Sequence, residues 1–435
     1  MQLSALRVTA LQRVVTGGMG VLGTLVIAHY MAPAEQGFYY TFVSFFFLQM
    51  LFELGFTFAL VNLVAHERTH MLGNPGDRAA LGRYAGVLRV GIVAGGLAGV
   101  AALIVIPAVG WVFFSHAAPA TDGNVQWQMP WLLSALGLCL LIPTQFVWAL
   151  LEGSDRIASV AWVRLAQDGL GQLGFWVALY LGLGLFAAVV FMGIRVSVAY
   201  GAMAWSGCRE LLHLAWMHRR ENVHLNWRAE VLPFQAKIAV SSIAGYLMSY
   251  TLNPILFRIY GPEYAGQWGM TYTLLTAAMS FSLLWVSTSV PRLCGLLARQ
   301  QAGAAWSQFK GAARRGLAMF GGLIMAFLGM VLLIESHFPE LRLRLLPMAD
   351  LAWLIMAMLG TFLIMAMNYF IRAHRREDFM LLLVALGGAT VAGGIVLGLQ
   401  LPAWAVNAYY ALLLLGLGTP WAYSILRARV GGLLS

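Results

Sequence analysis

Two arginines of this chain lie deep inside long apolar runs, where charged side chains are rare. Arg164 and Arg195 are the deepest of the basic residues. A charge near the middle of a bilayer costs about 2.5–3.5 kcal/mol by insertion scales, so such a residue marks a functional pathway. Arginine keeps its charge when buried, and its planar fork binds phosphate or carboxylate through paired hydrogen bonds. These residues predict that an anionic ligand is handled inside the membrane.

Further basic residues lie nearer the ends of apolar runs. They are Arg13, Arg89, Lys237, Arg258 and Arg292. Long basic side chains at such positions can extend along apolar surface to the membrane interface. Each of the five therefore either lines a cationic substrate cavity or contacts lipid phosphate at the interface.

Two acidic residues accompany the arginines. Asp168 follows Arg164 at the i, i+4 spacing, which permits an intrahelical ion pair. Such a pair either neutralises both charges or takes part in proton or ion coupling. Glu53 has no charged partner nearby in sequence, so it is either protonated or pairs with an arginine of another span.

Two other motifs have a functional and a local interpretation. Asn253-Pro254 interrupts an apolar run and frees backbone groups, which indicates either a hinge or a packing kink. The stretch from His66 to His70 matches H-E-x-x-H, in which His66, Glu67 and His70 would serve a zinc metalloprotease. It also reads as a polar helix end, and the cation Arg68 within it is unfavourable beside a metal ion.

The composition excludes a soluble globular protein. The 435 residues are 60% hydrophobic and only 10% charged, whereas average proteins carry about 25% charged residues. Apolar segments of about 20 residues, enough to cross a bilayer, recur from end to end. We therefore expect an all-α integral membrane protein. No phosphate-binding G-x-x-x-x-G-K-[ST] loop occurs, and we expect no enzyme activity, metal or cofactor.

The apolar runs predict about twelve transmembrane helices. Their approximate ranges are 11–31, 38–65, 84–114, 130–152, 158–181, 185–216, 234–259, 266–297, 310–336, 351–372, 379–400 and 403–426. Basic residues concentrate in alternate connections and in both tails, and the other connections carry only Arg342 and Arg344. The positive-inside rule then places both termini in the cytoplasm. The net charge of +10 thus reflects topology and does not indicate nucleic-acid binding.

A weak internal repeat divides the chain into halves. Residues 29–39 align with 258–268, so that Pro33 matches Pro262 and Gly37 matches Gly266. Each segment links the first two spans of a six-span half, as in secondary transporters with parallel repeats. We expect an N-terminal six-helix bundle over residues 1–217, a cytoplasmic linker over 218–233 and a C-terminal six-helix bundle over 234–435.

The repeat motifs also resemble a known family. The pattern Pro-x-x-x-Gly-x-aromatic followed by Leu-Gly-x-x-x-Ala-Leu is similar to that of the Wzx-like oligosaccharide flippases of the multidrug/oligosaccharidyl-lipid/polysaccharide (MOP) exporter superfamily. The matching residues are Pro33, Gly37, Tyr39, Leu54, Gly55, Ala59 and Leu60, with Gly261, Pro262, Gly266, Val290, Pro291, Arg292 and Leu293 in the second half.

The resemblance implies a fold and a function. The fold is a V-shaped arrangement of two pseudo-symmetric six-helix bundles. The function is export of an undecaprenyl-diphosphate-linked oligosaccharide across a bacterial inner membrane by alternating access, for O-antigen, capsule or exopolysaccharide assembly. Partners would be membrane lipids, a polysaccharide polymerase and glycosyltransferases. The alternatives are an ion-coupled drug or lipid exporter of the same superfamily and, in a different class, the zinc protease.

Overall fold

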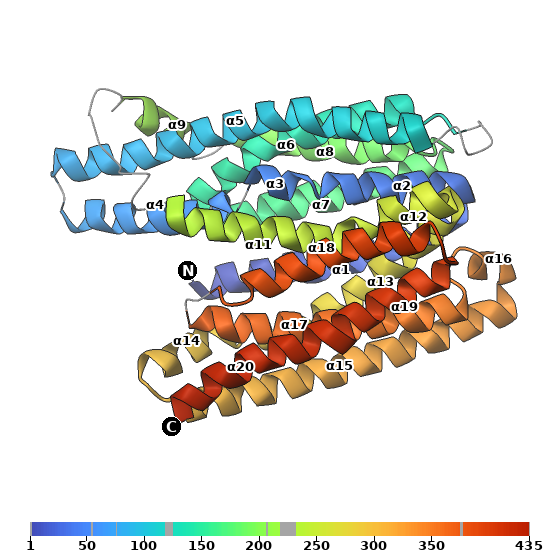
Figure 1. Cartoon of the computed structure of the whole chain (residues 1–435). Coiled ribbons are helices and arrows are strands. Elements are labelled where there is room, and N and C mark those ends of the chain that lie inside the picture. The colour runs from blue at the N-terminus through green and yellow to red at the C-terminus, as the bar shows by residue number, and fades with distance from the viewer. Residues whose placement is uncertain are drawn as a thin grey trace. The chain divides into compact units, whose positions relative to one another are not determined.

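The structure is a computed structural model that describes residues 2–53, 55–74, 76–117, 125–205, 208–217, 232–374 and 377–434. The described residues form helices and contain no strand; Figure 1 labels the helices in chain order. Of the expected linker over residues 218–233, residues 218–231 lie outside the described part of the chain. The fold is all-α, as the composition predicts.

Each of the twelve expected spans coincides with a helix or a run of consecutive helices. In the first half these are α1 (Gln2–Tyr30), α2 (Pro33–Phe46) with α3 (Gln49–Glu53) and α4 (Phe56–Gly73), α5 (Arg78–Ala117), α6 (Gln128–Gly153), α7 (Ile157–Tyr180), and α8 (Phe186–Trp205) with α9 (Cys208–Met217). In the second half they are α11 (Leu232–Tyr250) with α12 (Leu252–Tyr260), α13 (Pro262–Ser287) with α14 (Val290–Ala298), α15 (Ala302–His337) followed by the short α16 (Pro339–Arg342), α17 (Met348–Ala373), α18 (Met380–Gly398), and α19 (Ala403–Ala411) continued by the π-helix η2 (Leu412–Gly418) and α20 (Thr419–Leu434).

Length and composition make this a multi-pass membrane protein. Eight helices among the described residues are long and apolar enough to cross a membrane, and the bent run from α2 to α4 makes nine. α7 carries Arg164 and Asp168, and α11 is followed by a break at Thr251. These features explain why α7 and the run from α11 to α12 are not among the eight. α5, α8 and the run from α13 to α14 are among them, although they carry Arg89, Arg195 and Arg292.

The helices cluster into two compact units. The first contains residues 1–32 and 45–242, and the second contains residues 33–44 and 243–435. α2 therefore contributes its first part, up to Ser44, to the second unit. Each unit is described separately below.

In the first unit, α5 and α6 lie side by side because glycines remove the side chains between them (Figure 1). A Cβ atom on Gly95 would meet the ring of Phe146, one on Gly99 would meet Pro143, and one on Gly110 would meet Trp131. Small residues at such positions let membrane helices approach closely, since packing rather than hydrophobicity drives their association.

Two spans are interrupted beside candidate residues. Between α3 and α4 the chain bends by 42°, and Gly55 takes a left-handed conformation with φ 68° that glycine adopts without strain. Glu53 is the last residue before this bend. In the second half, α11 ends at Tyr250 and α12 starts at Leu252. Pro254 therefore lies in the first turn of α12, where proline is tolerated, and the break precedes the expected hinge.

In the second unit, the two repeat motifs pack against each other. α2 begins at Pro33 and α13 begins at Pro262, so the equivalent prolines start equivalent helices. A Cβ on Gly37 would collide with the Pro262 carbonyl group, and one on Gly266 would lie 2.9 Å from the Gly37 nitrogen. The paired glycines therefore permit a backbone-to-backbone helix crossing.

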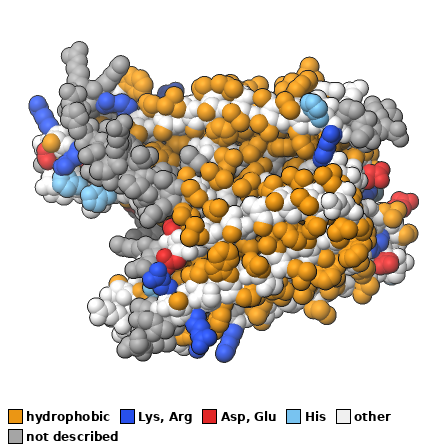
Figure 2. Space-filling model, viewed as in Figure 1, with side chains coloured by type: hydrophobic (Ala, Val, Ile, Leu, Met, Phe, Trp, Pro, Cys, Tyr) orange, Lys and Arg blue, Asp and Glu red, His pale blue; other side chains and the backbone are white. Residues whose placement is uncertain are grey.

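Hydrophobic side chains cover the middle of the helices on the face shown in Figure 2, while charged side chains gather toward the helix ends. Such a surface suits a lipid environment flanked by two polar interfaces.

Candidate substrate-binding site

Arg164 pairs with a carboxylate of a neighbouring helix. It lies in the second turn of α7, and its Nη1 atom is 2.7 Å from Oε1 of Glu152 in the last turn of α6. The Arg164 and Glu152 side chains are 36% and 23% exposed. A charge-assisted contact of this length is a strong one.

Arg195, in the middle of α8, pairs with Asp168 of α7. Its Nε atom lies 3.3 Å from Oδ1 of Asp168, with the side chains 23% and 30% exposed. The guanidinium also lies 5.2 Å from the ring centre of Phe191, a cation–π distance. The Arg195 Nε makes no hydrogen bond of good geometry with any described residue. This Nε atom is buried and faces the Asp168 carboxylate, so the contact is an ion pair rather than a well-aligned hydrogen bond.

The intrahelical pair permitted by the spacing of Arg164 and Asp168 is not the arrangement observed. Each residue has its ion-pair partner on another helix, α6 for Arg164 and α8 for Asp168. The reason is geometric: α7 contacts both α6 and α8, which also pack on each other, so side chains of both helices reach it. The Arg164 charge still acts on Asp168 at longer range.

These residues form one charge cluster, defined here as Glu53, Glu152, Arg164, Asp168 and Arg195. The Arg164 charge acts on Glu53 of α3 at longer range, and whether Glu53 is protonated or pairs with an arginine stays a prediction. Asp168 also has Gln12 of α1 within hydrogen-bonding reach. With all three carboxylates ionised, two cations face three anions, so the charge cluster carries a net charge of −1 and is not strongly cationic.

The remaining predicted basic residues are each described within their own unit. Arg89 of α5 donates from Nε to the carbonyl oxygen of Ala215 in α9, at 3.3 Å. Arg258, in the last turn of α12, and Arg292, on α14, are exposed. Arg13 and Lys237 lie on α1 and α11, but their side chains are outside the described residues.

Asn253 is held by hydrogen bonds on both sides of its amide. It is buried, accepts a hydrogen bond from Thr41 Oγ1 at 2.9 Å, and donates to the carbonyl oxygen of Ala265 at 2.9 Å. These contacts join α2, α12 and α13 within the second unit. A residue so constrained fixes the broken helix in place, and any hinge action would have to break these bonds.

A buried polar network ties three helices of the second unit. Asp350 in the first turn of α17 accepts hydrogen bonds from Tyr264 of α13 at 2.8 Å and from Asn407 of α19 at 2.7 Å. The Asn407 amide oxygen accepts from Trp268 Nε1 at 3.1 Å. Satisfied buried networks of this kind fix a unique packing arrangement.

Arg342 and Arg344, the arginines on the basic-poor side, have local roles. Arg342 donates from Nη1 to the carbonyl oxygen of Leu346 at 2.8 Å and lies 3.7 Å from Glu335. Gln36 donates to the Arg344 carbonyl oxygen at 3.3 Å. Burial lowers the pKa of the Arg344 guanidinium, and the nearby Glu263 carboxylate opposes that shift. The side-chain contacts of Arg342 thus have a local role, whereas the hydrogen bond from Gln36 to Arg344 involves the Arg344 backbone.

The H-E-x-x-H stretch lies near the end of α4 at the surface. Glu67 is 3.3 Å from His66 Nδ1 and 4.0 Å from Arg83 Nε, and Arg68 is 3.8 Å from Asp155. Among the described residues, no group of three or more His, Cys, Asp or Glu side chains is placed to hold a metal ion. The stretch is a polar helix end whose carboxylate already has a cationic neighbour.

Sequence reasoning missed Glu152, Asp350 and Asn407. Glu152 follows an apolar run directly, so it resembles an interfacial residue, and its partner is set by the packing of α6 on α7. Asp350 and Asn407 occur near the starts of two spans, where polar residues are ordinary. A usable signal for Asp350 was its place in a first helical turn, which favours a carboxylate.

No family model matches the sequence, and no curated protein matches it. The fold, however, is similar to those of several solved transporters. One is an inward-facing multidrug resistance MATE family transporter of the MOP superfamily, with a TM-score of 0.68, 12% identity and 98% of both chains covered. Another is the lipid II flippase MurJ in an inward closed conformation, with a TM-score of 0.61, 12% identity, and 96% of this chain and 87% of that chain covered. A third is a MOP superfamily transporter from Pyrococcus furiosus described as having reversed binding-pocket polarity, with a TM-score of 0.56, 13% identity, and 99% and 96% covered. At these identities the likeness concerns the fold: the chain has the fold of MOP superfamily transporters.

Proposed function

We propose that the protein is a flippase that moves an undecaprenyl-diphosphate-linked oligosaccharide across a bacterial inner membrane by alternating access. Its termini would face the cytoplasm, and it would serve polysaccharide assembly beside a polymerase and glycosyltransferases. The MOP transporter fold supports a transporter or flippase in general. The sequence motifs around Pro33 and Pro262 support the oligosaccharide branch.

The observation that carries the proposal is the pair of interior arginines. Arg164 and Arg195 lie on the packed helices α7 and α8, and both side chains are partly exposed. A diphosphate is the part of such a substrate that is most costly to desolvate. Guanidinium groups could replace its hydration by charge-assisted hydrogen bonds, exchanging their present carboxylate partners for phosphate oxygens. Before the ligand binds, each arginine is paired with a carboxylate, so neither guanidinium charge is unpaired in the empty protein.

Arg258, Arg292, Arg13, Arg89 and Lys237 would then act as entry or exit residues of the same pathway rather than as its centre. Arg89 is the weakest of them, because its Nε atom already donates to a backbone oxygen.

Flipping in reconstituted vesicles tests the proposal. Vesicles carrying the purified protein receive a lipid-linked oligosaccharide, and a membrane-impermeant lectin reports how much sugar remains outside. We expect sugar to become protected from the lectin with the wild-type protein and not with empty vesicles. Arg164→Ala and Arg195→Ala should each slow protection, whereas Arg315→Ala, a charge loss elsewhere in the chain, should not. If both variants fold and flip at the wild-type rate, the role of the interior arginines fails.

One observation favours the ion-coupled exporter of the same superfamily. The charge cluster contains three carboxylates, Glu53, Glu152 and Asp168, beside its two arginines, and acids of this kind can exchange protons or cations during transport. Imposing a proton or sodium gradient separates the candidates. A cationic drug that moves only with the gradient, while lipid-linked oligosaccharide does not move, would support the exporter and overturn the flippase.

A further inference from the structure

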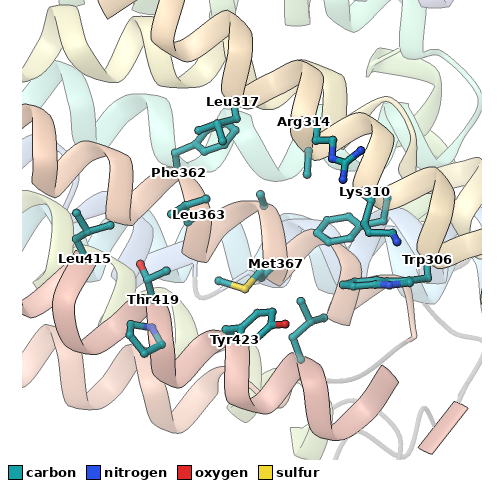
Figure 3. Close-up of a pocket in the computed structure, with 15 residues that line it drawn as sticks. Trp306, Lys310, Arg314, Leu317, Phe362, Leu363, Met367, Leu415, Thr419 and Tyr423 are labelled. Atoms are coloured by element: carbon teal, nitrogen blue, oxygen red, sulfur yellow. The ribbon is translucent and has the colours of Figure 1, made fainter. Parts of the chain in front are cut away.

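A second feature lies in the second unit, where four helical elements leave a cavity between them. Its volume is ≈ 530 Å³, and its walls come from α15, α17, η2 and α20. This size falls within the roughly 300–1,000 Å³ typical of ligand sites. Figure 3 shows Met367 in the middle of the cavity, with Phe362 and Leu363 along one side and Leu415 and Thr419 toward one end.

The cavity has an apolar body and a basic end. Lys310 and Arg314 stand one helical turn apart on α15, and Trp306 lies below them (Figure 3). The Lys310 ammonium is 5.7 Å from the Trp306 ring centre, within cation–π range. Most of the other lining residues are hydrocarbon, including Leu317, which is 41% exposed. The site therefore opens at the surface, with two cationic side chains at its entrance and an apolar wall.

The cavity lies beside a close contact between α15 and α17. A Cβ on Gly316 of α15 would lie 3.2 Å from the Phe362 ring of α17. The α15 residues that line the cavity run from Trp306 to Leu317. Across the cavity, η2 widens the helix just before Thr419 and Pro420. π-helical segments of this kind often occur at functional sites.

We propose that this cavity binds an anionic phospholipid of the surrounding bilayer, with its phosphate on Lys310 and Arg314 and an acyl chain along the wall formed by Phe362, Leu363 and Leu415. Charge complementarity selects this occupant, because a purely apolar solute would not use the two cations and a sugar would find few polar partners along the wall. Basic pockets between membrane helices bind anionic headgroups by the same chemistry. The site shares no residue with the charge cluster of Arg164 and Arg195, so it does not depend on the proposed function.

Lipid retention measured by native mass spectrometry tests the proposal. The full-length protein is purified, delipidated and exposed to phosphatidylglycerol or phosphatidylcholine. We expect at least tenfold stronger retention of phosphatidylglycerol by the wild type. The Lys310→Gln/Arg314→Gln double variant should lose that preference. Arg315→Gln is the matched control: it removes the same charge from the adjacent position, where the side chain lies 5.1 Å from the Trp285 ring centre and does not line the cavity.

Two further arms define what is recognised. Ala366→Phe places a ring at the cavity wall and should reduce retention while leaving both cations in place. Inorganic phosphate should not displace the bound lipid, since it lacks the chain. Any of three results would overturn the proposal. The wild type could retain both lipids equally, or inorganic phosphate could displace the lipid fully. The third is an unchanged preference in the Lys310/Arg314 double variant when that variant elutes as a single folded species.

Discussion

The Arg195–Asp168 pair offers the sharpest test of whether these interior charges serve a substrate or only each other. Neutralising one partner leaves the other charge unpaired inside the first unit, whereas neutralising both leaves none. We therefore consider Asp168→Asn, Arg195→Gln and the double variant. Each single variant should lose stability, and the double variant should recover much of that loss because the unpaired charge is gone.

The magnitude follows from the separation of the charged atoms. At 3.3 Å, two unit charges attract by about 5 kcal/mol at an effective dielectric constant of about 20 and by about 1.3 kcal/mol in bulk water. The side chains are 23% and 30% exposed, which places the pair between these limits. We expect a coupling energy of about 2 kcal/mol, inside the 0.5–3 kcal/mol usual for contacting residues.

Stability comes from thermal unfolding of the four proteins in detergent, and function comes from the vesicle flipping assay. If Arg195 serves the substrate, the double variant should be close to wild type in stability but at least tenfold slower in flipping. A coupling energy below about 0.5 kcal/mol would refute the interaction itself. A stable double variant that flips at the wild-type rate would show that the pair only neutralises its own charges.

Three further predictions concern packing, the polar network and topology. Gly37→Leu should abolish folded protein, because its side chain would collide with the first turn of α13, whereas Gly322→Leu should be tolerated because nothing lies near that position; fluorescence-detected size exclusion measures both. Asp350→Ala should lower stability by about 2–5 kcal/mol, since it strands two buried donors, and Asp350→Asn should lower it less, as seen by thermal unfolding. In a background without native cysteines, a membrane-impermeant maleimide applied to whole cells should label Leu183→Cys and not Asp77→Cys, and the reverse pattern would invert the proposed topology.

The spans could be predicted from the sequence because hydropathy and length are local properties. Breaks were partly predictable: Pro254 signalled an interruption, but the helix breaks at Thr251 because proline fits the first turn of the helix that follows. The bend after Glu53 depends on the left-handed conformation of Gly55, and glycine alone does not reveal which conformation it adopts.

Pairings between helices could not be predicted, because they depend on how each helix is rotated. Spacing placed Asp168 within reach of Arg164, but packing brought Glu152 and Arg195 to these residues instead. The same limit concealed the network around Asp350, whose members are more than fifty residues apart. The sequence did place acidic residues beside the arginines of α7 and α8, but it did not reveal that Glu152 would be the partner of Arg164.

The contribution of α2 to the second unit has a consequence for how the protein is made. Thr41 bonds to Asn253, 212 residues later, and Gln36 donates to the Gly266 carbonyl, 230 residues later. At roughly 5–20 residues per second, a ribosome needs about 10–40 s to bridge that interval. During this time the polar side chains of an early membrane helix lack their native partners. Biogenesis of this protein therefore includes a period in which α2 is already made while its partners on α12 and α13 are not.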